Sequence, residues 1–290
     1  MEQWSIDRIP VSTNDHLLEH EANAYLLTHN CEDALLIDAG YADSTQTILQ
    51  QIERRRAKLH GIYLTHYHPD HSLGAAYLAK LTDCPIYCHP LEYRPLLELY
   101  ASRSIEIKNI LIMPTLVNGS TVTHYNQSLD VIHTPGHTHG HIALHDKTSG
   151  IMFTGDTVIP QGTVWIGPPD GHLRDYLQSL DQLIARKPST VYPGHGGVTD
   201  QPDALMTAMK ARRLMREDQI ITLLQSSPKT LEQLTQEIYK ESVPTEMSWV
   251  ALKTVQGHLQ KIREDRTISV TVNPIANQIS YYIESTTSVK

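Results

Sequence analysis

Short apolar runs alternate with amphipathic segments through the first two hundred residues. Amphipathic periodicity predicts helices over residues 43–57, 72–81 and 173–185. Apolar runs predict strands at residues 23–27, 34–38, 61–64, 85–89, 121–125, 129–134, 141–145, 150–154 and 189–193. Strands and helices mixed in this order predict an α+β fold, in which sheets are covered by helices.

The pattern of apolar positions changes after about residue 200. The segments expected there are a long helix at residues 204–224, helices at 230–239 and 247–262, and two β-like runs at 267–272 and 278–283. Two helices followed by a hairpin are the outline of a small winged-helix module. We therefore predict two domains, residues 1–203 and residues 204–290. The last helix carries an apolar stripe that we expect to be core: Trp249, Leu252, Val255, Leu259 and Ile262.

Residues 91–118 fit this alternation poorly. Residues 91–100 have a helical pattern, and the rest, up to Asn118 and Gly119, has the character of a connection over the surface. An insertion of this length is typical of a lid or a substrate-binding element.

Composition indicates a globular protein with an acidic surface. The chain has 290 residues, 40% of them apolar, and a formal net charge of −8, which disfavours nucleic acid as a partner without excluding it. No apolar run approaches the roughly 18–20 residues of a membrane span, and the N-terminus lacks the features of a secretory signal. Three cysteines, an odd number, do not suggest a disulfide framework. We expect a cytoplasmic protein with no membrane partner.

Basic residues are spread without a clear stripe. Residues 229–290 carry as many basic as acidic side chains, which counts against nucleic-acid binding by the C-terminal module. The dense groups at residues 54–56 and at Arg212, Arg213 and Arg216 are explained by solvated helix faces.

The chain contains seventeen histidines, and the densest group is Thr65-His-Tyr-His-Pro-Asp-His71. His66 and His68 are two residues apart, so on extended backbone they can face the same way. Asp70 and His71, beyond the turn that Pro69 stiffens, then point toward a neighbouring position. Because one ion cannot easily take all four side chains from so short a segment, the motif favours two ions side by side.

Three further turns present ligand-type residues after predicted strands. They are Gly136-His137-Thr138, Gly155-Asp156-Thr157 and Gly194-His195-Gly196. Glycine lets the backbone turn sharply and approach an ion closely. A single histidine in a loop is ordinarily a surface or structural residue. Four ionisable side chains packed as in residues 66–71 would instead repel and desolvate one another without a function.

Together these four motifs resemble the metallo-β-lactamase superfamily over roughly residues 15–200. The resemblance implies an αββα sandwich with a dinuclear metal site at one edge. It implies that His66, His68 and His137 hold the first ion, that Asp70, His71 and His195 hold the second, and that Asp156 bridges them. Asp38 and His141 match positions that orient these ligands from behind.

The chain departs from true β-lactamases, which commonly use a cysteine at the second ion. None of Cys31, Cys84 and Cys88 lies in a matching turn. The nitrogen and oxygen ligand set resembles the glyoxalase II and nuclease type, so two zinc ions are our first choice and iron or manganese are alternatives. The C-terminal module resembles that of the lactamase-β-2-like subgroup, whose members include single-strand endoribonucleases and thioesterases acting on carrier-bound polyketides.

The resemblance implies a two-metal hydrolase. Two ions roughly 3.5–4 Å apart hold a bridging water, lower its pKa and deliver hydroxide to a carbonyl or phosphorus centre. We expect Asp70, besides binding metal, to orient this water and to receive its proton.

Candidate substrate contacts come from two segments. The Gly- and Pro-rich loop at residues 161–172 follows Asp156 closely, so Trp165 and Ile166 either form an apolar wall of the site or pack the loop. Tyr192, near His195, either donates to an oxyanion or belongs to the core.

Our leading hypothesis is hydrolysis of a small-molecule ester, lactone or thioester. Single-strand RNA cleavage is the alternative, and a metal-binding regulatory protein without catalysis is a third hypothesis. Glutathione thioesters remain candidate substrates, and a homodimer is an open option for the assembly.

Overall fold

The computed structural model describes residues 4–13, 21–29, 32–124, 127–240, 243–244, 247–265, 268–273 and 278–283. Cys31, Tyr125 and Thr267, which enter the predictions above, lie outside these ranges. Within them, no helix combines the length and the apolar character needed to cross a membrane.

The first sheet has six strands in sequence order. They are β1 (Ser5–Val11), β2 (Ala22–His29), β3 (Asp33–Ile37), β4 (Lys58–Tyr63), β5 (Ile86–Tyr87) and β6 (Ile112–Met113). β1 to β3 pair antiparallel, and β3 to β6 pair parallel. β2 is buried along its whole length, so it is a central strand with both faces covered. β1 and β6 were not predicted from the sequence.

The second sheet has five strands in the order β11-β10-β9-β8-β7. They are β7 (Thr121–His124), β8 (Gln127–His133), β9 (Ile142–Asp146), β10 (Ile151–Gly155) and β11 (Thr190–Pro193). Only β10 and β11 pair parallel; the other neighbours are antiparallel. β8, β10 and β11 therefore run in the same direction, and their C-terminal ends lie at one edge of this sheet.

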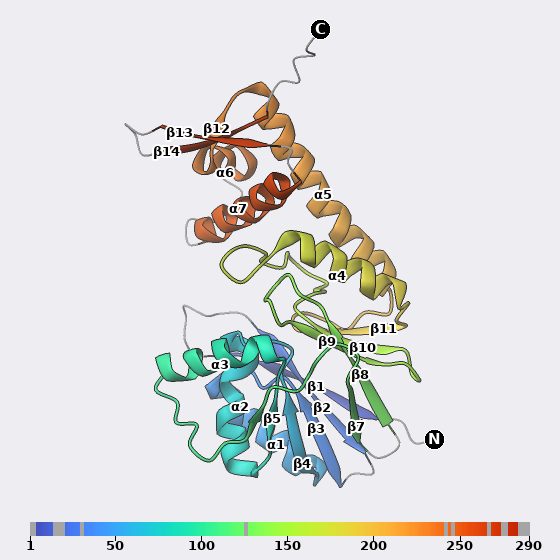
Figure 1. Cartoon of the computed structure of the whole chain (residues 1–290). Coiled ribbons are helices and arrows are strands. Elements are labelled where there is room, and N and C mark those ends of the chain that lie inside the picture. The colour runs from blue at the N-terminus through green and yellow to red at the C-terminus, as the bar shows by residue number, and fades with distance from the viewer. Residues whose placement is uncertain are drawn as a thin grey trace.

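Helices cover the outer face of each sheet (Figure 1). The first sheet is covered by η1 (Ala42–Ser44), α1 (Thr45–Arg55), α2 (Pro69–Thr82) and α3 (Pro90–Ser102). The second is covered by α4 (Leu173–Ala185) and the beginning of α5 (Pro202–Ser226). A separate apolar cluster fills the space between the sheets, with Tyr25, Leu35 and Ile37 from one side and Val131 and Phe153 from the other. These layers confirm the predicted mixed α and β fold.

The end of the chain forms a small module with its own core. Its elements are β12 (Lys229–Thr230), α6 (Leu231–Tyr239), α7 (Ser248–Glu264), β13 (Ser269–Asn273) and β14 (Gln278–Tyr282), with strand order β12-β14-β13. α5 connects this module to the sandwich: Met206 packs under the second sheet, whereas Ile220 and Leu224 pack in the module. Because one helix serves both cores, the domain boundary at residues 203 and 204 stays a prediction.

Four local expectations differ from the structure. α2 begins at Pro69, so Asp70 and His71 occupy its first turn rather than a loop, where an acidic group suits the helix dipole. Trp249, which was expected in the core of the last helix, is 55% exposed.

Arg213 was expected on a solvated helix face. It is buried instead, because α5 packs between the sandwich and the module. The segment 91–118 begins with α3, whose Tyr100 is fully buried in the first core, so this part is framework.

Candidate metal centre

The candidate ligands stand at strand ends along one edge of the sandwich. His66 follows β4, Asp156 follows β10, His195 follows β11, and His137 lies between β8 and β9. Two backbone hydrogen bonds tie the sheets together at this edge: Asn23 N–H donates to Gly194 O at 2.8 Å, and Ile142 N–H donates to Thr65 O at 3.0 Å. The two sheets thus fix turns that are far apart in sequence.

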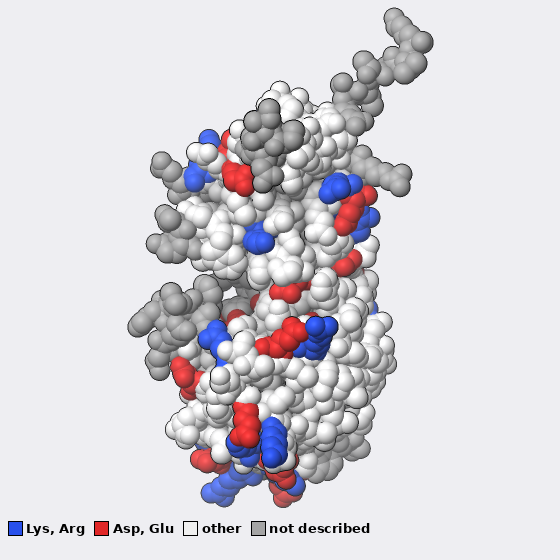
Figure 2. Space-filling view, turned by 60° about the vertical axis from the view of Figure 1, so that its left-hand side comes forward, with Lys and Arg blue, Asp and Glu red and all other residues white. Residues whose placement is uncertain are grey.

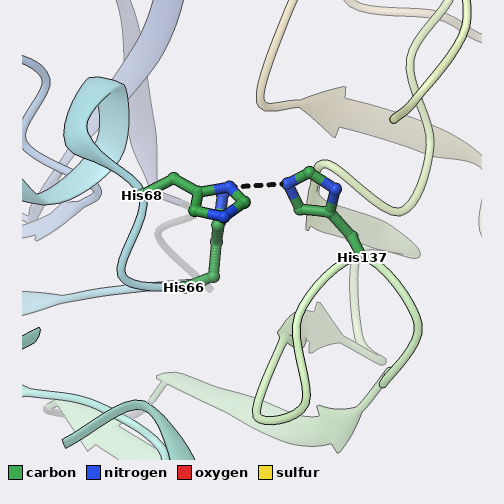
Figure 3. Close-up of side chains that lie close together, drawn as sticks. All are labelled: His66, His68 and His137. Atoms are coloured by element: carbon green, nitrogen blue, oxygen red, sulfur yellow. Dashed lines mark hydrogen bonds between the residues drawn. The ribbon is translucent and has the colours of Figure 1, made fainter. Parts of the chain in front are cut away.

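His66, His68 and His137 form the first cluster (Figure 3). One ring nitrogen of each lies within 4.8 Å of the others. His68 Nδ1 and His137 Nε2 are 2.9 Å apart. His66 is fully buried, and its Nε2 has no hydrogen-bond partner within the described part of the chain.

Asp70, His71 and His195 form the second cluster. His195 Nε2 lies 3.2 Å from Asp70 Oδ2 and 3.3 Å from His71 Nε2. His71 Nε2 lies 3.5 Å from the same Asp70 oxygen.

Asp156 lies between the clusters. Its Oδ2 is 3.4 Å from His137 Nε2 in the first cluster and 3.4 Å from His195 Nε2 in the second. Its Oδ1 is 3.3 Å from His71 Nε2. Gly194 makes this approach feasible, since a Cβ at that position would stand only 2.3 Å from Asp156 Oδ1. The arrangement suits a carboxylate shared by two cations.

Partners behind the rings fix the tautomers. His71 Nδ1–H donates to Asp38 Oδ2 at 2.9 Å, His137 Nδ1–H to Trp165 O at 2.8 Å, and His195 Nδ1–H to Glu21 O at 2.7 Å. A neutral ring that donates through Nδ1 keeps its lone pair on Nε2. In all three rings Nε2 is the nitrogen that faces the clusters.

His66 follows the same rule through Thr65. The Thr65 hydroxyl donates to Asp38 Oδ2 at 2.8 Å, so it accepts from His66 Nδ1–H at 3.1 Å and leaves the lone pair of His66 on Nε2. Asp38 Oδ1 also accepts the Thr65 N–H at 2.7 Å. Asp38 is buried at a left-handed φ of 56°, which aspartate tolerates better than most residues. Asp38 therefore contacts His71 directly and His66 through Thr65.

His141 acts on the backbone of Asp156 and not on the clusters directly. Asp156 N–H donates to His141 Nε2 at 3.0 Å. His141 Nδ1–H is then directed at the hydroxyls of Thr134, at 2.9 Å, and Thr157, at 3.1 Å. Burial and the nearby His137 hold the pKa of His141 well below its usual value, so the ring is neutral.

Histidines from the two clusters have pKa values shifted in opposite directions. Burial, followed by the neighbouring histidines, lowers the pKa of His66 and brings that of His137 to about 4. Burial also opposes charge on His195, but Asp156 and Asp70 outweigh it and raise the pKa to about 10. His71 is likewise raised by Asp70, Asp156 and Asp38 against burial. The first cluster therefore offers neutral imidazoles, and the second offers carboxylates that attract positive charge. Both features fit bound cations.

Two acidic residues that contact the loops of the site, Glu92 and Asp170, were not predicted from the sequence. Glu92, 1% exposed on α3, accepts from Tyr67 N–H at 2.8 Å, Gly140 N–H at 2.7 Å and Thr138 Oγ1 at 2.8 Å, and so joins the loop of residues 65–71 to that of His137. Asp170 accepts from Tyr67 Oη at 2.7 Å and lies 3.8 Å from His68 Nε2. An acid in the first turn of a helix and a Pro-Pro-Asp-Gly turn are ordinary patterns, so neither carried a usable signal.

The three predicted substrate contacts have different surroundings. The Trp165 ring lies parallel to that of His68, with centroids 6.1 Å apart, and its carbonyl holds His137. Ile166 is 1% exposed in the core under the second sheet, so its side chain is a packing residue. Tyr192 packs against Tyr25 and Phe153 between the sheets, which is the core alternative for this residue.

Comparison with known proteins defines the family. A family model described as the metallo-beta-lactamase superfamily matches residues 18–195, and the chain belongs to that superfamily. A beta-lactamase-like protein 2 homolog from Drosophila melanogaster is 28% identical over 258 residues, which cover 86% of this chain and 84% of that protein.

Two relatives carry the names of hydrolases. An atrochrysone carboxyl ACP thioesterase from Passalora fulva is 26% identical over 264 residues, covering 86% of this chain and 72% of that protein. A hydroxyacylglutathione hydrolase from Methylobacillus flagellatus is 30% identical over 183 residues, covering 62% and 64%. Family and relatives together support a hydrolase.

Solved structures share the fold. A beta-lactamase domain protein from Burkholderia ambifaria superposes with a TM-score of 0.83 at 18% identity, covering 96% of this chain and 91% of that one. A chain named TTHA1623, solved in a di-iron-bound form, gives a TM-score of 0.52 at 28% identity, covering 70% and 97%.

Proposed function

We propose that the protein is a dinuclear metal hydrolase. His66, His68 and His137 would hold one divalent cation, Asp70, His71 and His195 the other, with Asp156 between them. The observation that carries this proposal is the orientation of the rings: nitrogens of His66, His68 and His137 converge, and the buried Nε2 of His66 has no hydrogen-bond partner among the described residues. A buried lone pair without a partner is costly, and a bound cation would satisfy it.

The ligand set limits the choice of metal ion but does not identify one. Imidazole and carboxylate ligands suit zinc, our first choice, and also iron or manganese; the di-iron form of TTHA1623 supports the alternative. When bound, the two ions would supply a water of lowered pKa and polarise the bond to be cleaved.

Asp70 is the side chain that we assign to the attacking water and its proton. Asp70 is 19% exposed while its carboxylate touches the second cluster, so it can reach water on the open side of the site. Burial opposes its ionisation, but His71 and His195 hold the pKa of Asp70 well below its ordinary range. In this proposal the ionised carboxylate orients the attacking water and takes up its proton.

The proposed substrate is a small-molecule ester, lactone or thioester. The thioesterase and hydroxyacylglutathione hydrolase names of two relatives favour a thioester among these. The position of the Trp165 ring beside His68 supports its proposed contact with such a substrate.

RNA cleavage is the second candidate. The C-terminal helices and three-stranded sheet have the outline that we interpret as a winged helix, a module often associated with nucleic acid. On the face in Figure 2, however, acidic and basic side chains are interspersed without a continuous basic stripe. We place the protein in the cytoplasm and leave a homodimer as the assembly to test.

A hydrolysis panel with matched metal analysis tests the proposal. Protein loaded with zinc, iron or manganese is assayed on thioesters, lactones, β-lactams, bis(p-nitrophenyl) phosphate and single-stranded RNA. We expect about two metal ions per chain and turnover of a thioester or lactone. Two bound ions without turnover of any substrate would favour the regulatory hypothesis, and exclusive cleavage of RNA would favour the second candidate.

A further inference from the structure

A cavity of about 330 Å³ lies between the sandwich and the C-terminal module. Thr163, Val164 and Trp165 line it from the sandwich, α5 lines it from a second side, and α7 and the segment before it close the third. Its volume is that of a small-molecule site. The candidate metal centre is a neighbour, since Trp165 contacts both.

Three arginines of α5, Arg212, Arg213 and Arg216, face this cavity. Arg213 is 5% exposed and donates to Val164 O, and its guanidinium lies 5.6 Å from the centre of the Tyr176 ring. Arg212 Nη1 donates to Gly162 O at 2.8 Å. Within the described ranges none of the three makes an ion pair, although each guanidinium offers five N–H donors.

Unpaired positive charge at this depth is costly. Burial lowers the pKa of Arg213, and the adjacent Arg212 and Arg216 act in the same direction. Aromatic faces offset part of this cost, with Arg216 lying 4.8 Å from the centre of the Tyr239 ring. An anion would offset the rest, and the planar guanidinium is the preferred partner of carboxylate and phosphate groups.

His258 of α7 adds a second, independent signal. The side chain lines the cavity and is 1% exposed, yet neither ring nitrogen has a hydrogen-bond partner in the described structure. Burial, reinforced by Arg213, lowers the pKa of His258 to about 3, so the ring is neutral at pH 7. A neutral imidazole offers one donor and one acceptor, and buried polar atoms of this kind are normally satisfied.

The remaining wall is apolar. Met247, Val250 and Ala251 line the cavity opposite the sandwich, together with Val243 and Pro244. A bare inorganic ion would leave these side chains without contacts. The occupant should therefore combine an anionic end with an apolar body.

We propose that this cavity binds an organic anion, whose carboxylate or phosphate pairs with Arg213 and its neighbours while its apolar part contacts Met247 and Val250. The site goes beyond the proposed hydrolase function, because binding here requires neither metal nor turnover. Its position behind Trp165 gives the occupant contact with the segment that orients His137.

Calorimetric titration of the full chain tests the proposal with four probes. Octanoate and octyl phosphate carry both features and distinguish carboxylate from phosphate, octanol lacks the charge, and inorganic phosphate lacks the apolar part. We expect at least one charged octyl probe to bind at least tenfold more tightly than octanol and inorganic phosphate. Equal affinity for octanol and both charged octyl probes would overturn the proposal.

Variants locate the binding. Arg213→Met should weaken the tighter octyl probe at least tenfold, and the Arg212→Gln/Arg216→Gln double variant, at less buried positions, covers the case in which the first does not fold. Arg186→Gln makes the same charge change at an exposed residue of the sandwich, at the end of α4, and should leave affinity unchanged. Unaltered affinity in folded Arg213→Met and in the double variant would place the probe elsewhere and refute the assignment.

Absence of octyl-probe binding in the wild-type protein would contradict the proposal.

Discussion

Two regions of this protein gather charged side chains of opposite sign, and Trp165 contacts both. The candidate metal centre gathers Asp38, Asp70 and Asp156, whereas the cavity beside the C-terminal module gathers the arginines of α5. In the metal centre the outer nitrogen of each oriented ring has a partner within the chain. In the cavity most guanidinium donors have none among the described residues.

This difference indicates two modes of binding. A site whose ligands are held from behind is organised before the ion arrives, so selection depends on geometry. A site with open donors and apolar walls depends instead on the charge and the apolar contacts of its occupant. The formal net charge of −8 hides both regions, because charge summed over a chain does not reveal which charges are buried together.

The largest expected effect is that of Asp156→Ala, which removes the group between the two clusters. We expect loss of bound metal and a fall of about 10³-fold or more in kcat/KM, measured by elemental analysis and by turnover. Asp33, His60 and His124 also lie close enough to hold an ion, so His60→Ala serves as the control and should retain both activity and the two ions of the centre. Two metal ions retained in Asp156→Ala would refute its bridging position.

Asp38→Asn tests whether the hydrogen bonds of Asp38 to Thr65 and His71 contribute to metal affinity. The amide would direct N–H groups at the Thr65 hydroxyl or at His71 Nδ1–H, so we expect metal affinity and activity to fall about 10–100-fold. Competition with a metal chelator measures the affinity. Asp83→Asn is the matched control, because Asp83 has a similar left-handed φ of 53° but is exposed at the end of α2. Similar losses in both variants would point to backbone conformation as the cause.

Glu92→Gln tests the brace between the two loops. The amide would set N–H donors against N–H donors, and we expect a loss of about 1–3 kcal/mol in the free energy of unfolding, measured by denaturant titration. Glu98→Gln, on the exposed face of the same helix, should change stability by less than about 0.5 kcal/mol. If the two variants unfolded alike, Glu92 would not be the link we describe.

Trp165→Ala has the smallest expected effect and probes the contact between the two regions. Metal content should stay at the wild-type level, because His137 is held by the Trp165 carbonyl and not by its ring. KM for the best substrate should rise about two- to tenfold through loss of ring contacts. Trp249→Ala, which removes only the outer ring of the Trp165 pair, should have a weaker effect. An unchanged KM in Trp165→Ala would exclude this ring from substrate binding.

Much of the fold was predictable because its signals are local. The residue ranges of α4, β11 and α6 agree with the apolar patterns to within about one residue. The candidate ligands were recognisable because each of the four motifs follows a predicted strand and contains proline or glycine. β1 and β6 were missed: β1 is an edge strand of mixed polarity, and β6 has only two residues.

Contacts between distant segments were not predictable. The separation of Trp249 from the core stripe, the burial of Arg213 and the packing of Ile166 depend on how α5 and the module dock onto the sandwich. Glu92 resembles any acid at a helix start until the fold brings Tyr67 and Gly140 to it.

The sequence by itself therefore determined the layered fold, the family and the identity of the candidate ligands, because spacing along strands and turns is local information. Only the tertiary structure decided which nitrogen of each histidine faces the clusters, that Glu92 joins the loops of the site, and that three arginines with His258 line a cavity. Those properties arise from side chains that meet across elements, where burial removes water and leaves each polar group dependent on the partner that packing brings to it.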